Sequence, residues 1–181
     1  CDHARHGPHE FAHLPRLRHA VSAGEPLNPE VIARFQDVLG LTVYDGYGQA
    51  ENSLLVASTP GAPLRAGSMG QPTPGHDIAV IDEAGNVCPS DVEGDLALMG
   101  RPPTLLSGYW EAPEEADALF RDGWFLTGDR ATRDADGYLW FEGRADDLIL
   151  SSGYRIGPFE VESALVSHPA VAEAAAVATP D

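Results

Sequence analysis

Three short stretches hold side chains that could bind a nucleotide or a metal ion. A glycine-containing turn ends in Glu51, whose carboxylate could hold Mg²⁺. Asp129 comes at the end of an expected strand, where its carboxylate could accept two hydrogen bonds from a ribose diol. The third stretch carries Arg144 and Arg155, which suit phosphate or ribose, and Gly153 lets a thin ligand approach the backbone. Taken singly, each residue also fits an ordinary turn or surface position.

The elements that would position these residues begin as an α/β unit. Residues 17–22 predict a short buried strand, and 41–44 predict a second one. Between them Asn28 caps a helix that Gly40 ends. A strand–helix–strand order favours a parallel pair in an α/β sheet, and such sheets bind ligands in the loops after their strands. Those loops are the turn around Gly24 and the stretch 45–51.

From about Gly67 the expected elements change to short strands separated by turns. This pattern predicts a small β-rich subdomain with a barrel-like sheet. Its strands are expected at 78–81, 94–99, 124–126 and 138–142, with a short helix at 113–120. A strand at 148–150, a helix from 158 to about 166 and a last strand at 171–177 would follow. The predicted fold class is therefore α/β plus a β-rich subdomain.

Composition limits the kinds of partner. The chain has 28 acidic and 11 basic residues, a formal net charge of −17. Such a surface repels phosphate backbones, which argues against nucleic acids and anionic membranes. Two cysteines cannot make a disulfide framework and suit a reducing compartment, so a cytoplasmic location is expected. No window reaches the roughly 18 apolar residues that a membrane span needs.

Five motifs occur in order along the chain. They are SAGEPL at 22–27, DGYGQAE at 45–51, TGDR at 127–130, GRADDLI at 143–149 and SGYRIGPFEVE at 152–162. The series resembles the adenylate-forming superfamily of acyl-CoA synthetases, luciferases and nonribosomal-peptide adenylation domains, from about residue 14 to the end. The residues of these motifs are most similar to those of the medium-chain, butyrate-type branch of the acyl-CoA synthetases.

The resemblance implies a domain plan and a reaction. The chain would be part of the large N-terminal domain and the start of the small C-terminal domain of an adenylate-forming enzyme. Its α/β part would cover 1–66, the β-rich part 67–145, and the hinge with the C-terminal domain 146–181. In such an enzyme a carboxylate attacks the α-phosphorus of ATP, and CoA then takes the acyl group from acyl-AMP. The implied ligands are ATP or AMP, Mg²⁺, CoA and a short- to medium-chain fatty acid.

The resemblance also assigns nucleotide contacts to particular positions. Gly24, Glu25 and Pro26 would line the adenine. The segment around Tyr47 would flank the adenine and the acyl pocket, and it comprises Asp45, Gly46, Tyr47, Gly48, Gln49 and Ala50.

Further roles follow from the same resemblance. Glu51 would hold Mg²⁺, at the opposite end of the nucleotide from Asp129, which would bind the ribose hydroxyls. Arg144 would contact ribose or phosphate. The remaining three positions would be Asp146 as the hinge of the C-terminal domain, Gly153 beside the pantetheine tunnel and Arg155 near phosphate in one conformation.

One departure from the family pattern and one absence bear on activity. Ala50 stands where the family usually has a threonine that bonds the α-phosphate. Losing such a bond would cost about 1.5–3 kcal/mol, or roughly ten- to a hundredfold in rate; Asn52 or Ser53 could partly substitute. The chain contains no lysine, and the family's catalytic lysine and phosphate loop are not in this sequence. Both ends are therefore expected to be cut, and the chain alone is expected to be inactive without the missing parts.

Two alternatives stay open. One is another branch of the superfamily, such as an aryl- or acetyl-CoA synthetase or a peptide-synthetase adenylation domain, which the acyl pocket would separate. The other is a non-catalytic, truncated module that binds nucleotide weakly or is purely structural. The missing lysines favour the second for the isolated chain.

Overall fold

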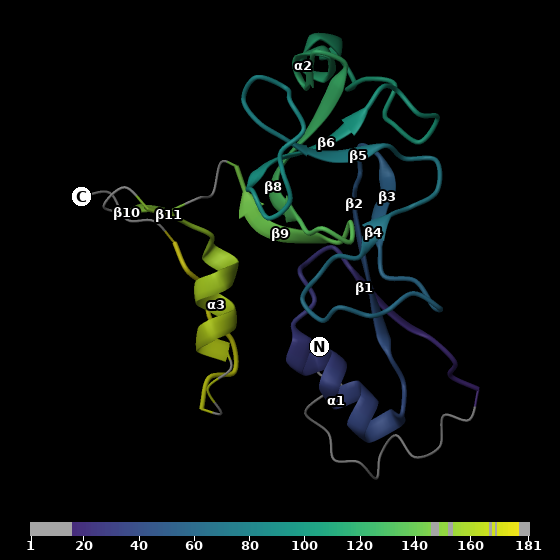
Figure 1. Ribbon diagram of the computed structural model, residues 1–181, viewed down its shortest axis with the longest axis vertical. Helices are drawn as coiled ribbons and strands as arrows, with labels where there is room; N and C mark the ends of the chain where they lie inside the picture. The colour runs from purple at the N-terminus through teal and green to yellow at the C-terminus, as the bar shows by residue number, and fades with distance from the viewer. Residues whose placement is uncertain (1–15, 146–148, 152–153, 167, 169, 178–181) are drawn as a thin grey trace.

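The computed structural model describes residues 16–145, 149–151, 154–166, 168 and 170–177 (Figure 1). Two sheets form most of this part of the chain (Figure 1). The predicted combination of an α/β unit with a β-rich part is confirmed. No helix in the described ranges is long and apolar enough to cross a bilayer.

The first sheet has the order β1-β2-β3-β4. Its strands are β1 (Ala20–Ala23), β2 (Val43–Gln49), β3 (Ser53–Ala57) and β4 (Gln71–Pro72). β1 and β2 are parallel because helix α1 (Pro29–Leu39) connects them, whereas the other pairs are antiparallel. The Asn28 side chain accepts the Glu30 N–H at 2.9 Å, and Gly40 ends the helix with φ 64°. The predicted strand–helix–strand unit and both of its caps are therefore confirmed.

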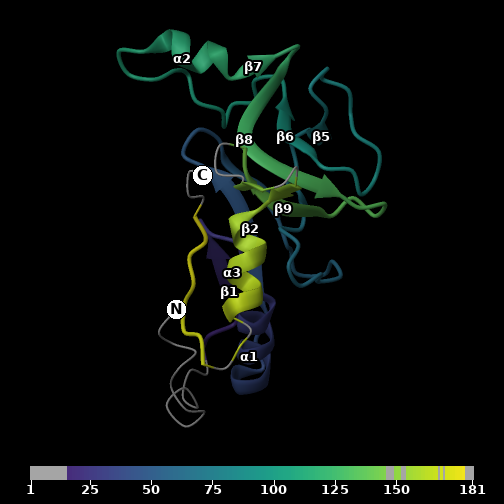
Figure 2. The ribbon, with the colours of Figure 1, turned by 90° about the vertical axis from the view of Figure 1, so that its left-hand side faces the viewer.

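The second part of the chain forms an antiparallel sheet around β8. Its elements are β5 (Ile78–Ile81), β6 (Gly94–Met99), α2 (Pro113–Ala118), β7 (Phe120–Arg121), β8 (Trp124–Arg133) and β9 (Leu139–Arg144). β6 lies along one edge of β8, and β7 and then β9 lie along the other. Figure 2 shows β8 as the long curved strand beside β6. The pairing of β8 with β6 and with β9 shifts register near Arg130. Such irregularities bend a strand and increase its twist, in agreement with the curvature of β8.

One hydrophobic core joins the two sheets. Buried side chains of β3, among them Leu55 and Val56, pack with side chains of β5, β6, β8 and β9. The chain before β4 also bonds directly to the second sheet, since Met69 N–H donates to the Leu139 carbonyl and Leu139 N–H to the Gly70 carbonyl, both at 2.9 Å. The division at 66/67 stays a prediction, and β4 extends the first sheet beyond that point.

The C-terminal elements are a hairpin and a helix. They are β10 (Ile149–Ser151), β11 (Tyr154–Ile156) and α3 (Pro158–Val166). The start of α3 lies against β9, because a Cβ on Gly157 would come within 2.2 Å of the Glu142 carbonyl oxygen. The predicted strand at 171–177 is wrong, since residues 171–177 follow α3 as irregular chain. An apolar run such as VAEAAAV forms a strand only where a partner strand is available.

A second correction concerns the stretch 45–51. It was expected to be the loop that follows the predicted strand 41–44, but β2 continues through Gln49 and pairs with β3. The turn is shorter and comes at residues 50–52. The candidate side chains of this motif are therefore fixed on a strand.

Candidate functional site

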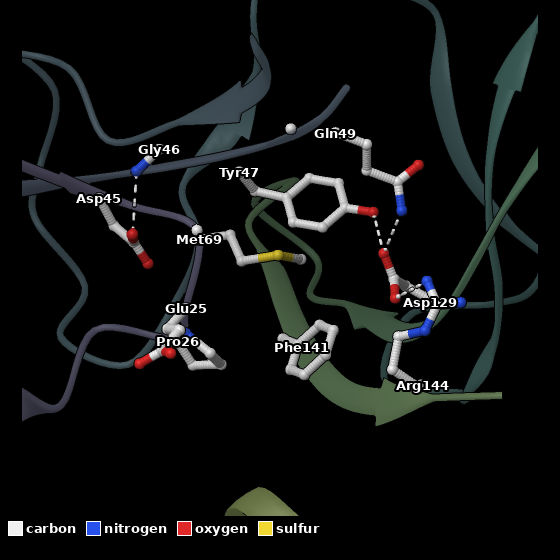
Figure 3. Close-up of a pocket in the computed structure, with 12 residues that line it drawn as sticks. Glu25, Pro26, Asp45, Gly46, Tyr47, Gln49, Met69, Asp129, Phe141 and Arg144 are labelled. Carbon is white, nitrogen blue, oxygen red and sulfur yellow. Dashed lines mark hydrogen bonds and ion pairs between the residues drawn. The ribbon is translucent and has the colours of Figure 1, made fainter. Parts of the chain in front are cut away.

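A cavity of about 300 Å³ lies where the turn after β1 and the second half of β2 face β8 and β9. We call it the inter-sheet cavity. Its lining residues are Gly24, Glu25, Pro26, Asp45, Gly46, Tyr47, Gly48, Gln49, Met69, Asp129, Phe141 and Arg144. Figure 3 shows Asp45 and Glu25 on one side and Asp129 with Arg144 on the other.

Asp129 is held by donors from both sheets. It lies on β8, is only 4% exposed, and accepts the Tyr47 hydroxyl on Oδ2. The Gln49 amide donates to the same oxygen at 2.8 Å, and an Arg144 nitrogen lies 3.1 Å from Oδ1. Gly128 (φ 76°) precedes it, and a Cβ there would meet the Arg144 guanidinium at 3.3 Å. Charge-assisted hydrogen bonds on both oxygens fix the orientation of this carboxylate.

Tyr47 supplies a neutral hydroxyl and an aromatic face. Burial, followed by the charge of Asp129, raises the pKa of Tyr47 far above its usual value. The phenol therefore remains a donor across the physiological range. Its ring lies between the two sides of the cavity, near Met69 (Figure 3).

Asp45 is a second, differently placed carboxylate. Burial raises the pKa of Asp45 to about 6, although the backbone N–H groups of Gly46 and Leu27 donate to it and oppose the rise. The Gly46 bond is 2.9 Å long. An acceptor that changes charge near neutral pH therefore lies on the side of the cavity away from Asp129.

Replacing Asp45 by asparagine is expected to stabilise the protein at about pH 7.5 but not at about pH 4.5. The folded pKa exceeds the unfolded value of 3.8, so the folded state binds the proton more tightly. The charged form therefore costs stability, and the cost appears as the pH rises from about 4 through 6. A fully buried group would pay about 3 kcal/mol, which solvent screening at this partly exposed site reduces to about 1 kcal/mol. Thermal melts should show a gain of about 2–4 °C at the higher pH.

The matched control is Asp37→Asn on the exposed face of α1, which removes the same charge. It should leave the melting temperature nearly unchanged at both pH values. An equal gain for Asp45→Asn at both pH values would refute the assignment of the cost to ionisation.

Glu51 was expected to face the opposite end of the nucleotide from Asp129, but it does not line the inter-sheet cavity. The side of the cavity away from Asp129 holds Asp45 instead (Figure 3). Glu51 sits in the turn after β2 and is not among the lining residues. The Tyr109 hydroxyl donates to its Oε1 at 2.9 Å, and its backbone carbonyl accepts the Leu106 N–H at 2.6 Å. Sequence reasoning missed this contact with the segment before α2. In the described ranges no group of three or more His, Cys, Asp or Glu side chains could hold a metal.

The other expected positions fall outside the cavity or outside the described residues. Ala50 is exposed and does not line the cavity. Asn52 is fully buried and is not a lining residue either. Asp146 and Gly153 lie outside the described residues. The backbone of Arg155 belongs to β11, but its side chain lies outside the described part.

Two lining residues were not predicted. Met69 comes from the segment before β4 and Phe141 from β9. Both are apolar and face the space between Pro26 and Asp129 in Figure 3. Neither residue type signals chemistry by itself, so only the folded arrangement reveals them.

The fold is that of adenylate-forming enzymes. It superposes with a TM-score of 0.84 and 35% identity on the anthranilate CoA ligase AuaEII in complex with anthranoyl-AMP, over 99% of this chain and 33% of that one. The O-succinylbenzoate CoA synthetase of Bacillus subtilis, in complex with ATP and magnesium, gives 0.83 and 32% over 96% and 36%. The chain belongs to the AMP-binding enzyme family, whose profile matches residues 2–110.

Relatives in that family are acyl-CoA synthetases. The mitochondrial acyl-coenzyme A synthetase ACSM4 of Rattus norvegicus is 52% identical over 169 residues, which cover 92% of this chain and 29% of that protein. The uncharacterized acyl-CoA ligase YtcI of Bacillus subtilis is 53% identical over 168 residues, covering 93% and 32%. The chain thus spans about a third of the length of these relatives.

The expected cytoplasmic location is contradicted by these comparisons. The ACSM4 proteins of rat and mouse and the ACSM3 protein of mouse are mitochondrial. Cysteine content reports only on a reducing environment, and it carries no information about which compartment provides that environment.

Proposed function

We propose that this chain forms the adenylate-binding part of an AMP-forming acyl-CoA synthetase. In that reaction a carboxylate oxygen attacks the α-phosphorus of ATP and pyrophosphate leaves; the CoA thiolate then attacks the acyl carbon and AMP leaves. The carrying observation is that Tyr47, Asp129 and Arg144 converge on one cavity beside the Gly24 turn. The relative that holds anthranoyl-AMP, the same class of intermediate, supports the proposal.

Different residues of the inter-sheet cavity would contact different parts of the nucleotide. The turn formed by Gly24, Glu25 and Pro26 and the face of Tyr47 would line the adenine. The fixed carboxylate of Asp129 would accept the ribose hydroxyls. The Arg144 side chain is 43% exposed, so its guanidinium can reach a ribose or phosphate oxygen while it pairs with Asp129.

The residues outside the cavity keep their proposed roles. Asp146 would be the hinge, Gly153 would border the pantetheine tunnel and Arg155 would approach phosphate in one conformation. Glu51 would hold Mg²⁺; a single carboxylate fits this ion, which is usually bound by one or two carboxylates together with substrate phosphates. The bound ion would neutralise phosphate charge.

We propose a short- to medium-chain fatty acid as the carboxylate substrate. Identity of 52% to an acyl-coenzyme A synthetase favours this branch. A second candidate is an aryl-CoA ligase, because the anthranilate CoA ligase shares the fold at 35% identity. The lower identity makes it the weaker of the two.

We expect the 181-residue chain to bind AMP without catalysing adenylation. Calorimetry should give a Kd of about 0.1–1 mM, or about −4 to −5.5 kcal/mol. No pyrophosphate should be released from ATP, Mg²⁺ and butyrate or octanoate, because the chain has no lysine to stabilise the developing phosphate charge. A folded chain that binds neither AMP nor an acyl-AMP mimic would refute the nucleotide site. Turnover well above a protein-free blank would refute the predicted inactivity.

A further inference from the structure

Gln49 connects the two sheets at the inter-sheet cavity. It lies at the end of β2, and its side-chain nitrogen donates to the Thr127 carbonyl and to Asp129 Oδ2, both at 2.8 Å. Both acceptors belong to β8. The Gln49 amide of the first sheet therefore donates both to a backbone carbonyl and to a carboxylate of β8 in the second sheet.

The segment of β8 that Gln49 bonds, from Thr127 to Asp129, is also held by hydrogen bonds within its own sheet. The Thr127 hydroxyl donates to the Leu96 carbonyl at 2.8 Å, and the Asp129 N–H lies 3.2 Å from that hydroxyl oxygen. These bonds set the backbone but not the rotation of the Asp129 carboxylate, which is intrinsically broad about its terminal torsion. Its orientation therefore depends on donors to the two oxygens.

Those donors divide into two sides. Arg144 approaches Oδ1 from β9, whereas Gln49 and Tyr47 donate to Oδ2 from β2. The Tyr47 ring also lines the cavity (Figure 3), so removing it would change contacts with the adenine as well. Gln49 also lines the cavity, but its side-chain nitrogen donates to the Thr127 carbonyl and to Asp129, so its loss changes chiefly the carboxylate.

We infer that Gln49 is a positioning residue that orients the Asp129 carboxylate toward the ribose hydroxyls of the nucleotide. The inference rests on the proposed function and deepens it. Gln49 acts through Asp129, so its contribution appears only when the ligand carries those hydroxyls. A purely structural inter-sheet bond would affect every nucleotide alike.

The test compares AMP with 2′,3′-dideoxy-AMP in the 181-residue chain. Wild type should bind AMP about 10–30-fold more tightly, as expected for hydrogen bonds to a charged group. Gln49→Met keeps the side-chain length but removes both donors. It should weaken AMP binding about tenfold and dideoxy-AMP binding less than twofold, so the ratio falls to about 1–6. Gln49→Glu, which places a carboxylate against Asp129, should reduce the ratio similarly.

The matched control is Gln71→Met. Gln71 also donates its amide to a backbone carbonyl, that of Asp136 at 3.0 Å, but lies outside the cavity. It should keep the wild-type ratio. An unchanged ratio in Gln49→Met, equal losses for both nucleotides, or unfolding of both Gln49 variants by circular dichroism would overturn the inference. Wild type that fails to bind AMP would instead overturn the proposed function itself.

Discussion

Replacing Asp129 by asparagine is expected to weaken AMP binding about thirtyfold. The variant loses the charge that would accept the ribose hydroxyls, and its amide nitrogen must face either the donors from Tyr47 and Gln49 or the Arg144 guanidinium. Hydrogen bonds to a charged group are worth about 1.5–3 kcal/mol, and a thirtyfold change corresponds to about 2.0 kcal/mol. Titration calorimetry of wild type and variant with AMP measures the ratio.

The Asp129→Asn substitution should change the free energy of unfolding less than it changes the free energy of AMP binding. Breaking a fully buried ion pair costs about 3–5 kcal/mol, but Arg144 is 43% exposed and can be solvated when its partner is lost. Asp134→Asn is the matched control, because Asp134 also pairs with an arginine, Arg65, and accepts backbone N–H groups but lies away from the cavity. If Asp129→Asn binds AMP as tightly as Asp134→Asn does, Asp129 is not the ribose contact.

The elements that the sequence predicted best are those fixed by local chemistry. Helix α1 was predicted from the cap at Asn28 to the end at Gly40, because each cap is set by residues within one turn. The resemblance of the ordered motifs assigned Asp129 and Arg144 to one nucleotide, and a nitrogen of Arg144 lies 3.1 Å from Asp129 Oδ1. Local signals do not report partner strands, so β3 and the short β4 were not predicted.

The glycines of β2 show why the sheet pairing and part of the cavity lining were harder to predict. Gly48 was interpreted as part of a turn, and glycine in the interior of a strand weakens it. In the structure a Cβ at Gly48 would lie 1.9 Å from the Ser53 carbonyl oxygen, and one at Gly46 would meet the Leu54 side chain at 2.9 Å. Glycine is needed here for close approach to β3, not for a loop, and that requirement depends on a strand whose position the sequence does not reveal. The same limitation hid Met69 and Phe141.

Replacing Gly70 by alanine is expected to cause the largest loss of stability, at least about 3 kcal/mol. Gly70 has φ 103°, and a Cβ there would lie 2.1 Å from the Ala57 carbonyl carbon and 2.3 Å from the Ser58 nitrogen. Those atoms are backbone at the end of β3, so they cannot move aside as a flexible side chain would. A thermal melt should show a decrease of about 6–12 °C for a protein of this size.

Gly75→Ala separates the clash from the backbone strain. Gly75 has a similar φ of 91°, but a Cβ there would meet nothing within 4 Å. Its substitution should cost only the conformational strain, about 1–2 kcal/mol. The two variants should therefore differ by several degrees, and equal melting temperatures would show that the approach to β3 is not tight. Because Gly70 also bonds Leu139 and follows Met69 of the cavity wall, Gly70→Ala should weaken AMP binding, whereas Gly75→Ala should not.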